Sequence, residues 1–177
     1  MSGFSGTGHA LDLICWRMFL SANRRPLRRN MRWAGDEMVA KLQIRVAWDE
    51  CDPDGLVHIV NYYRWMDQAL HALMLEAGFG HRAILEKFNA YVPAVEASAR
   101  CTAPLRFDDP VTIEAEISHW GRRSFRIDYR GYCGSRRVFE GSEARVWATI
   151  EDGEARSAAI PEAFRLALAE VAGAPAA

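Results

Sequence analysis

The sequence predicts an α+β domain in which one long helix lies against one curved antiparallel sheet. A single stretch, roughly Val60 to Ala77, carries apolar residues at helical spacing. Four later stretches alternate apolar and polar residues, as strands with one buried face do. Short polar connections join these stretches, which favours an antiparallel meander. One helix cannot cover both faces of such a sheet, so the open edges and face favour a homo-oligomer.

The helical stretch follows a first strand that is expected from about residue 41. The apolar residues of this strand alternate up to Trp48, and turn-forming residues then fill positions 49–55. The apolar surface of the helix is wider than one stripe, so other elements should enclose the helix. Gly78 is a natural residue to end it.

The remaining strands are expected where small or apolar residues alternate with polar ones. Glu143 and Arg145 fall in the polar set of the last long strand, opposite Ser142, Ala144 and Val146. Asp152-Gly153 predicts a hairpin turn into a short strand, and Pro161 opens a last helix to about Val171. The expected apolar sets lie within 95–103, 111–117, 125–129 and 142–150.

Length and composition indicate one globular domain with enough apolar material for a core. The chain has 177 residues, of which 50% are hydrophobic and 25% charged. The formal net charge of -1 points to neither nucleic acid nor a membrane, and no apolar run is long enough to span a bilayer. The 4 cysteines have neither metal-site nor redox spacing. We therefore expect no metal, reduced thiols and a cytoplasmic protein.

The N-terminal segment differs in charge from the rest of the chain. Residues 1–38 read as a basic extension without packed structure, because arginines dominate the charge of this segment. The segment is interpreted as a mobile tail, or as the product of an upstream start codon with Met31 or Met38 as the natural first residue. An Arg-rich transit peptide is the alternative. The domain proper is expected at 39–172, with a short tail at 173–177.

The turn before the helix holds the first candidate for chemistry, Asp52. Asp-Pro and Asp-Gly pairs form turns for local reasons alone, so a purely structural Asp52 is the competing interpretation. Two physical points favour a functional role, however. A carboxylate at this place can act as a nucleophile or base, and the free amides of the helix start can stabilise an oxyanion. The residues before the helix, 57–60, offer no strong side-chain cap, which would leave these amides free for a ligand.

Other candidates are weaker when each is taken alone. Arg122 and Arg123 lie in a turn between two strands and could bind phosphate, although an ordinary solvated turn is the better interpretation of that pair by itself. His58 lies next to the proposed site, where packing or substrate contact is the favoured role. His71 and His81 are expected to face solvent. The sequence has no G-x-S-x-G motif and no phosphate-binding glycine loop.

Several of these motifs together resemble one family. The segment Cys51–Val57, followed by Asn61–Asp67, is similar to the signature of the 4-hydroxybenzoyl-CoA thioesterases. The resemblance extends over about residues 40 to 170 without a large gap. Shorter segments that also look similar are 101–103, 108–109, 111–114 and 120–125.

The resemblance implies a hot-dog fold, with five or six antiparallel strands wrapped around one central helix. It implies active sites between two subunits of a homotetramer built as a dimer of dimers. Asp52 matches the catalytic aspartate, and the Ile59 amide matches the group that polarises the thioester carbonyl. Asp67 matches an aspartate near the far end of the acyl pocket. Arg122, Arg123 and Ser124 match the segment that meets the nucleotide part of coenzyme A.

The function expected on this basis is hydrolysis of an acyl-CoA thioester, with coenzyme A as part of the substrate and no separate cofactor. The acyl group is expected to be aryl, with 4-hydroxybenzoyl as the leading case. Asp52 acts either as nucleophile or as general base. Three departures from the family pattern matter. His58-Ile59 bears on acyl selectivity, Gly121 bears on CoA affinity, and Asp54 places a second carboxylate two positions from Asp52. The alternatives are a short-chain aliphatic thioesterase and a non-catalytic acyl-CoA-binding module.

Overall fold

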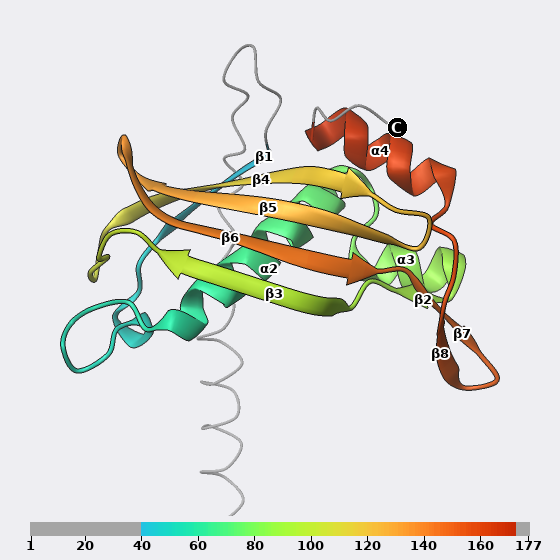
Figure 1. Ribbon diagram of the computed structural model, residues 1–177, viewed down its shortest axis with the longest axis horizontal. Coiled ribbons are helices and arrows are strands. Elements are labelled where there is room, and N and C mark those ends of the chain that lie inside the picture. Colours follow the sequence, from blue (N-terminus) through green and yellow to red (C-terminus); the bar gives the residue numbers. More distant parts are fainter. Residues whose placement is uncertain (1–39, 173–177) are drawn as a thin grey trace, which may run out of the picture.

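The computed structural model describes residues 40–172 (Figure 1). The basic extension and the C-terminal tail expected from the sequence therefore lie outside the described residues. The elements in chain order are β1 (Ala40–Arg45), η1 (Trp48–Glu50), α2 (Ile59–Glu76), α3 (His81–Phe88), β2 (Ala90–Tyr91), β3 (Ala94–Cys101), β4 (Pro110–Trp120), β5 (Ser124–Cys133), β6 (Arg136–Val146), β7 (Ala148–Glu151), β8 (Glu154–Ser157) and α4 (Glu162–Ala172).

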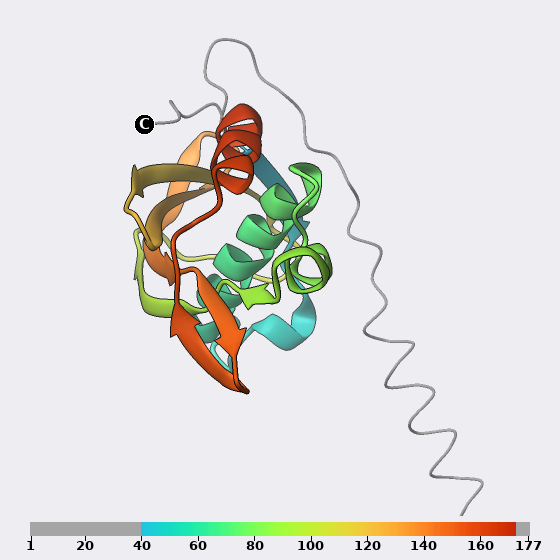
Figure 2. The ribbon, with the colours of Figure 1, turned by 90° about the vertical axis from the view of Figure 1, so that its right-hand side faces the viewer.

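The main sheet has five strands in the order β1-β4-β5-β6-β3, and each neighbouring pair is antiparallel. Figure 2 looks at the molecule from one end and shows α2 inside the curve of this sheet. The prediction of one curved antiparallel sheet around one long helix is confirmed. A second, small sheet of β2, β7 and β8 lies beyond the end of the main one.

Helix α2 is enclosed on one face only, because 8 of its 18 residues are buried whereas Arg64, Asp67 and Leu75 are exposed. It runs from Ile59 to Glu76, within one residue of the bounds predicted from spacing. Gly78 ends it with a positive φ of 77°, and the amide of Ala77 donates to the carbonyl of Leu73. The buried residues of α2 are Asn61, Tyr62, Trp65, Met66, Ala69, Leu70, Leu73 and Met74.

The sheet approaches α2 closely at Gly141 on β6. A Cβ atom there would lie 2.4 Å from the Met66 sulfur and 2.7 Å from the carbonyl oxygen of Ser98. Only glycine fits this contact, because real Cβ atoms do not come so near other heavy atoms. The side chains that follow at alternate positions along β6 therefore also point toward the helix.

The buried face of β6 is the opposite of the one expected from the sequence. Glu143 and Arg145 are buried, whereas Ser142, Ala144 and Val146 are only half-buried. The prediction placed the small residues inside because it assumed that charged side chains face water. It was wrong because the two charges neutralise each other inside the protein, as described below.

Strand β3 is exposed along its whole length, although alternation predicted a buried face. It lies at one edge of the sheet and pairs only with β6. Val95 is 63% exposed, and Ala99 is the one residue of β3 that reaches half-burial. Within a single chain, nothing in residues 40–172 covers this strand.

The region after α2 contains elements that were not predicted, namely α3 and β2.

The C-terminal elements match expectation more closely. Asp152 and Gly153 have φ values of 53° and 82° and join β7 to β8, as the hairpin prediction requires. Helix α4 begins directly after Pro161, and its buried Phe164 packs edge-on against Phe79. Aromatic packing thus joins α4 to the end of the α2 region.

Candidate active site

The turn between η1 and α2 holds Asp52 in a defined orientation. Its Oδ1 atom accepts hydrogen bonds from the amides of Asp54, at 3.0 Å, and Leu56, at 3.1 Å. Gly55 supplies the positive φ of 74° that the turn needs. These bonds alone would explain an aspartate at this position. Its Oδ2 atom, however, accepts no hydrogen bond from residues 40–172 and is free for chemistry.

A buried carboxylate, Glu50, fixes this turn to α2. Its side chain accepts hydrogen bonds from the amide of Ala47, at 2.7 Å, and from the indole of Trp65, at 3.1 Å. Its backbone carbonyl accepts from the amide of His58, at 3.0 Å, and from the side chain of Asn61, at 2.8 Å. Sequence reasoning missed Glu50 and Asn61. The signal available for Asn61 was a polar residue one position before Tyr62, at the start of the helical stretch.

The start of α2 presents one free backbone donor. The expectation of no side-chain cap was wrong, because Nδ1 of His58 accepts from the amide of Val60 at 3.4 Å. The amide of Asn61 donates to the carbonyl of His58. The Ile59 amide has no acceptor within the described part of the chain, and the Ile59 side chain is exposed. Asp52 and a free amide thus lie at the two ends of one short segment.

The other reactive groups near this turn are held in their neutral forms. Burial first, and then Asp52 and Glu50, raise the pKa of the Cys51 thiol. Burial and the neighbouring Cys101 raise the pKa of the Tyr62 hydroxyl. A neutral thiol and a neutral phenol are poor nucleophiles. Cys51 and Tyr62 are therefore poorly suited to attack a carbonyl or to accept a proton from water.

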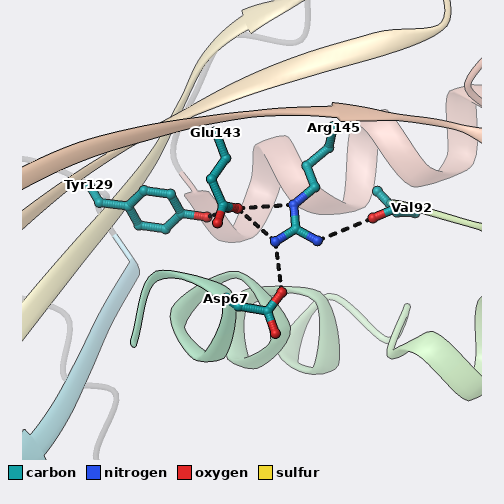
Figure 3. A network of polar contacts seen from close by, with 5 residues as sticks. All are labelled: Asp67, Val92, Tyr129, Glu143 and Arg145. Carbon is teal, nitrogen blue, oxygen red and sulfur yellow. Dashed lines mark hydrogen bonds and ion pairs between the residues drawn. The ribbon is translucent and has the colours of Figure 1, made fainter. Parts of the chain in front are cut away.

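Asp67 lies two turns of α2 beyond Ile59 and belongs to a network of charges (Figure 3). Its Oδ1 atom accepts a hydrogen bond of 2.7 Å from Nη2 of Arg145. Arg145 also contacts Oε2 of Glu143 through Nε and Nη2, at 3.0 and 2.7 Å. That same oxygen accepts from the Tyr129 hydroxyl at 3.1 Å. This network explains why two charged residues of β6 point inward.

The two histidines near Asp67 depart in part from expectation. His71 is half-buried rather than solvent-facing, and its Nδ1 atom has no hydrogen-bond partner among the described residues. His81 is exposed, as expected, and its ring stacks on that of His71 with centroids 4.9 Å apart. Partial burial, and then His71, lower the pKa of His81, whereas Asp67 acts in the opposite direction.

Arg122 and Arg123 lie in the turn between β4 and β5, and Ser124 is the first residue of β5. This turn lies at the other end of the molecule from the turn that holds Asp52 (Figure 1). The carbonyls of Arg122 and Arg123 accept from the amides of Ile160 and Trp147, which fixes the turn against the C-terminal region. Both arginine side chains are exposed. Helix α2 has 18 residues and spans about 27 Å between the two ends. One chain therefore does not bring Asp52 and the arginine turn together.

A third arginine, Arg165 of α4, contacts the same turn. Its guanidinium lies 5.2 Å from the ring centre of Trp120 and donates to the carbonyl of Gly121.

No cluster of His, Cys, Asp and Glu within residues 40–172 could hold a metal ion. No helix in this part of the chain is long and apolar enough to cross a membrane.

Comparison with known proteins places this fold in one class. The model of the thioesterase superfamily matches residues 54–140. The 4-hydroxybenzoyl-CoA thioesterase of Pseudomonas sp. (strain CBS-3) is 33% identical over 86 residues, which are 48% of this chain and 61% of that protein. The match thus spans less than two thirds of that curated relative.

Solved structures match over almost their whole length. A gentisyl-coenzyme A thioesterase is 33% identical with a TM-score of 0.65, and the match covers 72% of this chain and 98% of that one. A mutant 4-hydroxybenzoyl CoA thioesterase, complexed with 4-hydroxybenzoyl CoA, is 25% identical with a TM-score of 0.70; the match covers 74% of this chain and 99% of that one. The molecule is a hot-dog protein. The chain belongs to the thioesterase superfamily.

Proposed function

We propose that this protein hydrolyses aryl-CoA thioesters to the carboxylic acid and free coenzyme A. The observation that carries the proposal is the pairing of two groups at the start of α2. Asp52 has a free carboxylate oxygen, and the Ile59 amide is a free donor in the same short segment. Acyl transfer needs this combination of a nucleophile or base and an oxyanion-stabilising donor.

The reaction has two routes that the same groups serve. In the first, Asp52 attacks the thioester carbon, the C–S bond breaks, and the CoA thiolate leaves and takes a proton from solvent; water then hydrolyses the resulting anhydride. In the second, Asp52 accepts a proton from a water molecule that attacks the carbonyl directly, the C–S bond breaks, and the CoA thiolate leaves and takes a proton. In both routes the Ile59 amide donates to the carbonyl oxygen as negative charge develops there.

The distance between the two ends of α2 supports an assembly of at least two copies. Arg122, Arg123 and Ser124 would bind the phosphates of coenzyme A in a site whose Asp52 belongs to the neighbouring copy. The exposed edge strand β3 supplies unpaired backbone for such an association. The resemblance to the 4-hydroxybenzoyl-CoA thioesterases extends the proposal from a dimer to a dimer of dimers. The free cysteines Cys51, Cys101 and Cys133 fit a reducing compartment such as the cytoplasm.

The proposed acyl group is a hydroxylated aromatic ring, with 4-hydroxybenzoyl as the leading case. Asp67 offers a carboxylate oxygen to a ring hydroxyl, and His58 would contact the substrate at the thioester end. Two relatives that are each 33% identical over their matched regions are named as thioesterases of 4-hydroxybenzoyl-CoA and gentisyl-coenzyme A. Both names describe hydroxylated aryl esters.

The test is thiol release from a panel of CoA esters, with wild type and Asp52→Asn compared side by side. We expect turnover on aryl esters and a loss of about 10²-fold or more in Asp52→Asn, because the asparagine can neither attack nor accept a proton. Asp54→Asn is the matched control, since it changes the neighbouring turn carboxylate and should leave turnover nearly intact. Turnover confined to short aliphatic esters would keep the chemistry and overturn the aryl assignment. Binding of acyl-CoA without any thiol release would indicate a binding module instead.

A further inference from the structure

Arg145 is the one cation of the buried network in Figure 3, and two carboxylates share it. The Arg145 and Glu143 side chains are only 6% and 4% exposed, whereas the Asp67 side chain is 57% exposed. The network therefore begins in the core and ends at a carboxylate on the surface of α2. Only Oδ1 of Asp67 contacts Arg145, and Figure 3 shows the other oxygen turned away from it.

We propose that Arg145 is a positioning residue for acyl-group specificity, which holds Asp67 so that its free oxygen accepts a hydrogen bond from a ring hydroxyl of the substrate. The inference rests on the proposed aryl-CoA function and adds to it the group that orients the specificity-determining carboxylate. Arg145 itself does not touch the substrate in this proposal, because its donors are directed at protein groups.

The contacts of Arg145 fix its guanidinium on three sides. Nε and Nη2 both contact Glu143, Nη1 donates to the carbonyl of Val92 at 3.3 Å, and Nη2 also reaches Asp67. Tyr129 in turn orients Glu143. Burial alone would lower the pKa of Arg145, but its hydrogen bonds to Asp67 and Glu143 outweigh that effect and raise it. A guanidinium held in this way offers Asp67 a hydrogen-bond donor, Nη2, at a fixed position.

The place of Asp67 on α2 suits one aromatic ring. Ile59 and Asp67 are eight positions apart, so they lie about 12 Å apart along the helix axis. A single aromatic ring with a hydrogen bond at its thioester carbonyl and another at its opposite hydroxyl has a length of the same order. A longer acyl group would not place a terminal hydroxyl at Asp67.

The charge of the network determines what the free oxygen selects. Arg145 is shared between Glu143 and Asp67, so the exposed end of the network is an acceptor with no spare donor. A ring hydroxyl donates a hydrogen bond to the free oxygen of Asp67. An unsubstituted ring leaves that oxygen without a donor, and a ring carboxylate places a second negative charge next to it.

The experiment compares kcat/KM for 4-hydroxybenzoyl-CoA with kcat/KM for benzoyl-CoA and takes their ratio as the readout. Four proteins form a double-mutant cycle: wild type, Arg145→Lys, Asp67→Asn and the double variant. Lysine keeps the charge of Arg145 but loses the fork. We expect Arg145→Lys to lower the ratio about tenfold, which is of the order expected for one charge-assisted hydrogen bond. In the Asp67→Asn background the same change should not lower the ratio further.

Arg130→Lys is the matched control, because Arg130 also pairs with a carboxylate, Glu116, from a strand of the same sheet but at a partly exposed position. It should leave the ratio unchanged. If Arg145→Lys impairs folding, Tyr129→Phe removes a single donor to Glu143 and should lower the ratio about twofold. An Arg145→Lys variant that slows both esters equally would overturn the proposal and make Arg145 a structural residue. An equal loss of ratio in both Asp67 backgrounds would overturn it as well.

Binding separates this inference from the proposed function. The Kd values of the two esters, measured on Asp52→Asn and on the same variant carrying Arg145→Lys, give a ratio that needs no turnover. A wild-type protein without thioesterase activity would overturn the function. A Kd ratio that still falls in the Arg145→Lys protein would support the positioning role in that case, and an unchanged Kd ratio would overturn it.

Discussion

Two buried carboxylates, Glu50 and Glu143, anchor two parts of α2 in different ways. The side chain of Glu50 accepts from two neutral donors, an amide and an indole, and from the exposed Arg64. Glu143 accepts from a phenol and from the buried Arg145. The first arrangement fixes a segment of backbone and the second fixes another side chain. The comparison teaches that neutral donors can orient a buried carboxylate. A buried cation such as Arg145 also connects that carboxylate to a residue far away in the sequence, here Asp67.

The largest effect should come from removing the buried cation. Arg145→Met leaves Glu143 in the core without its charge partner, and we expect a loss of about 3–5 kcal/mol in the free energy of unfolding. Urea denaturation followed by far-UV circular dichroism measures it. The double variant Arg145→Met/Glu143→Met should recover much of the loss, since it buries no unpaired charge. If the double variant is no more stable than Arg145→Met, the unpaired charge of Glu143 is not the cause of the loss.

A smaller loss is expected at the other anchor. Glu50→Ala leaves the amide of Ala47 and the indole of Trp65 buried without an acceptor, and should cost about 2–3 kcal/mol in the same denaturation measurement. Arg64→Met is its control, because the Arg64 side chain is 58% exposed and should contribute at most about 1 kcal/mol. Equal losses in the two variants would mean that Glu50 depends on its cation after all, as Glu143 does.

The smallest effect concerns pH and the histidine pair beside Asp67. The pKa of His81 is lowered in the folded state, so the unfolded chain binds more protons than the folded one between the folded pKa and about 6.5. Stability should therefore fall slightly as pH drops below about 6.5 through that window. The His81→Gln variant should show a weaker fall, measured as Tm across a pH series. A steeper fall in that variant would contradict the assigned direction.

The helix and the site turn could be predicted because their signals are local. The spacing of apolar residues placed α2 within one residue, since a periodic run longer than four turns has few competing interpretations. The turn at Asp52 followed from Pro53 and Gly55, which restrict the backbone wherever they occur.

The buried network could not be predicted because its members become compatible with the core only through one another. Glu143 and Arg145 are two residues apart on β6, and alternation assigned both to the solvent face. Their third partner, Asp67, lies 78 positions away from Arg145 in the sequence. The His58 cap was missed for a related reason. An imidazole is an uncommon cap, and the geometry of the chain entry determines whether it can act as one.

The placement of Asp52 and the arginine turn at opposite ends of α2 has a consequence for mixtures of chains. If each site takes its carboxylate from one copy and its arginines from another, then a copy lacking Asp52 and a copy lacking Arg122 are each inactive alone but complementary together. With random pairing, half of the dimers contain one copy of each kind, and one of the two sites in each such dimer has both Asp52 and the arginines. About one quarter of all sites would then be complete. Two genes that encode such defective copies could then sustain the reaction jointly, although neither could do so by itself.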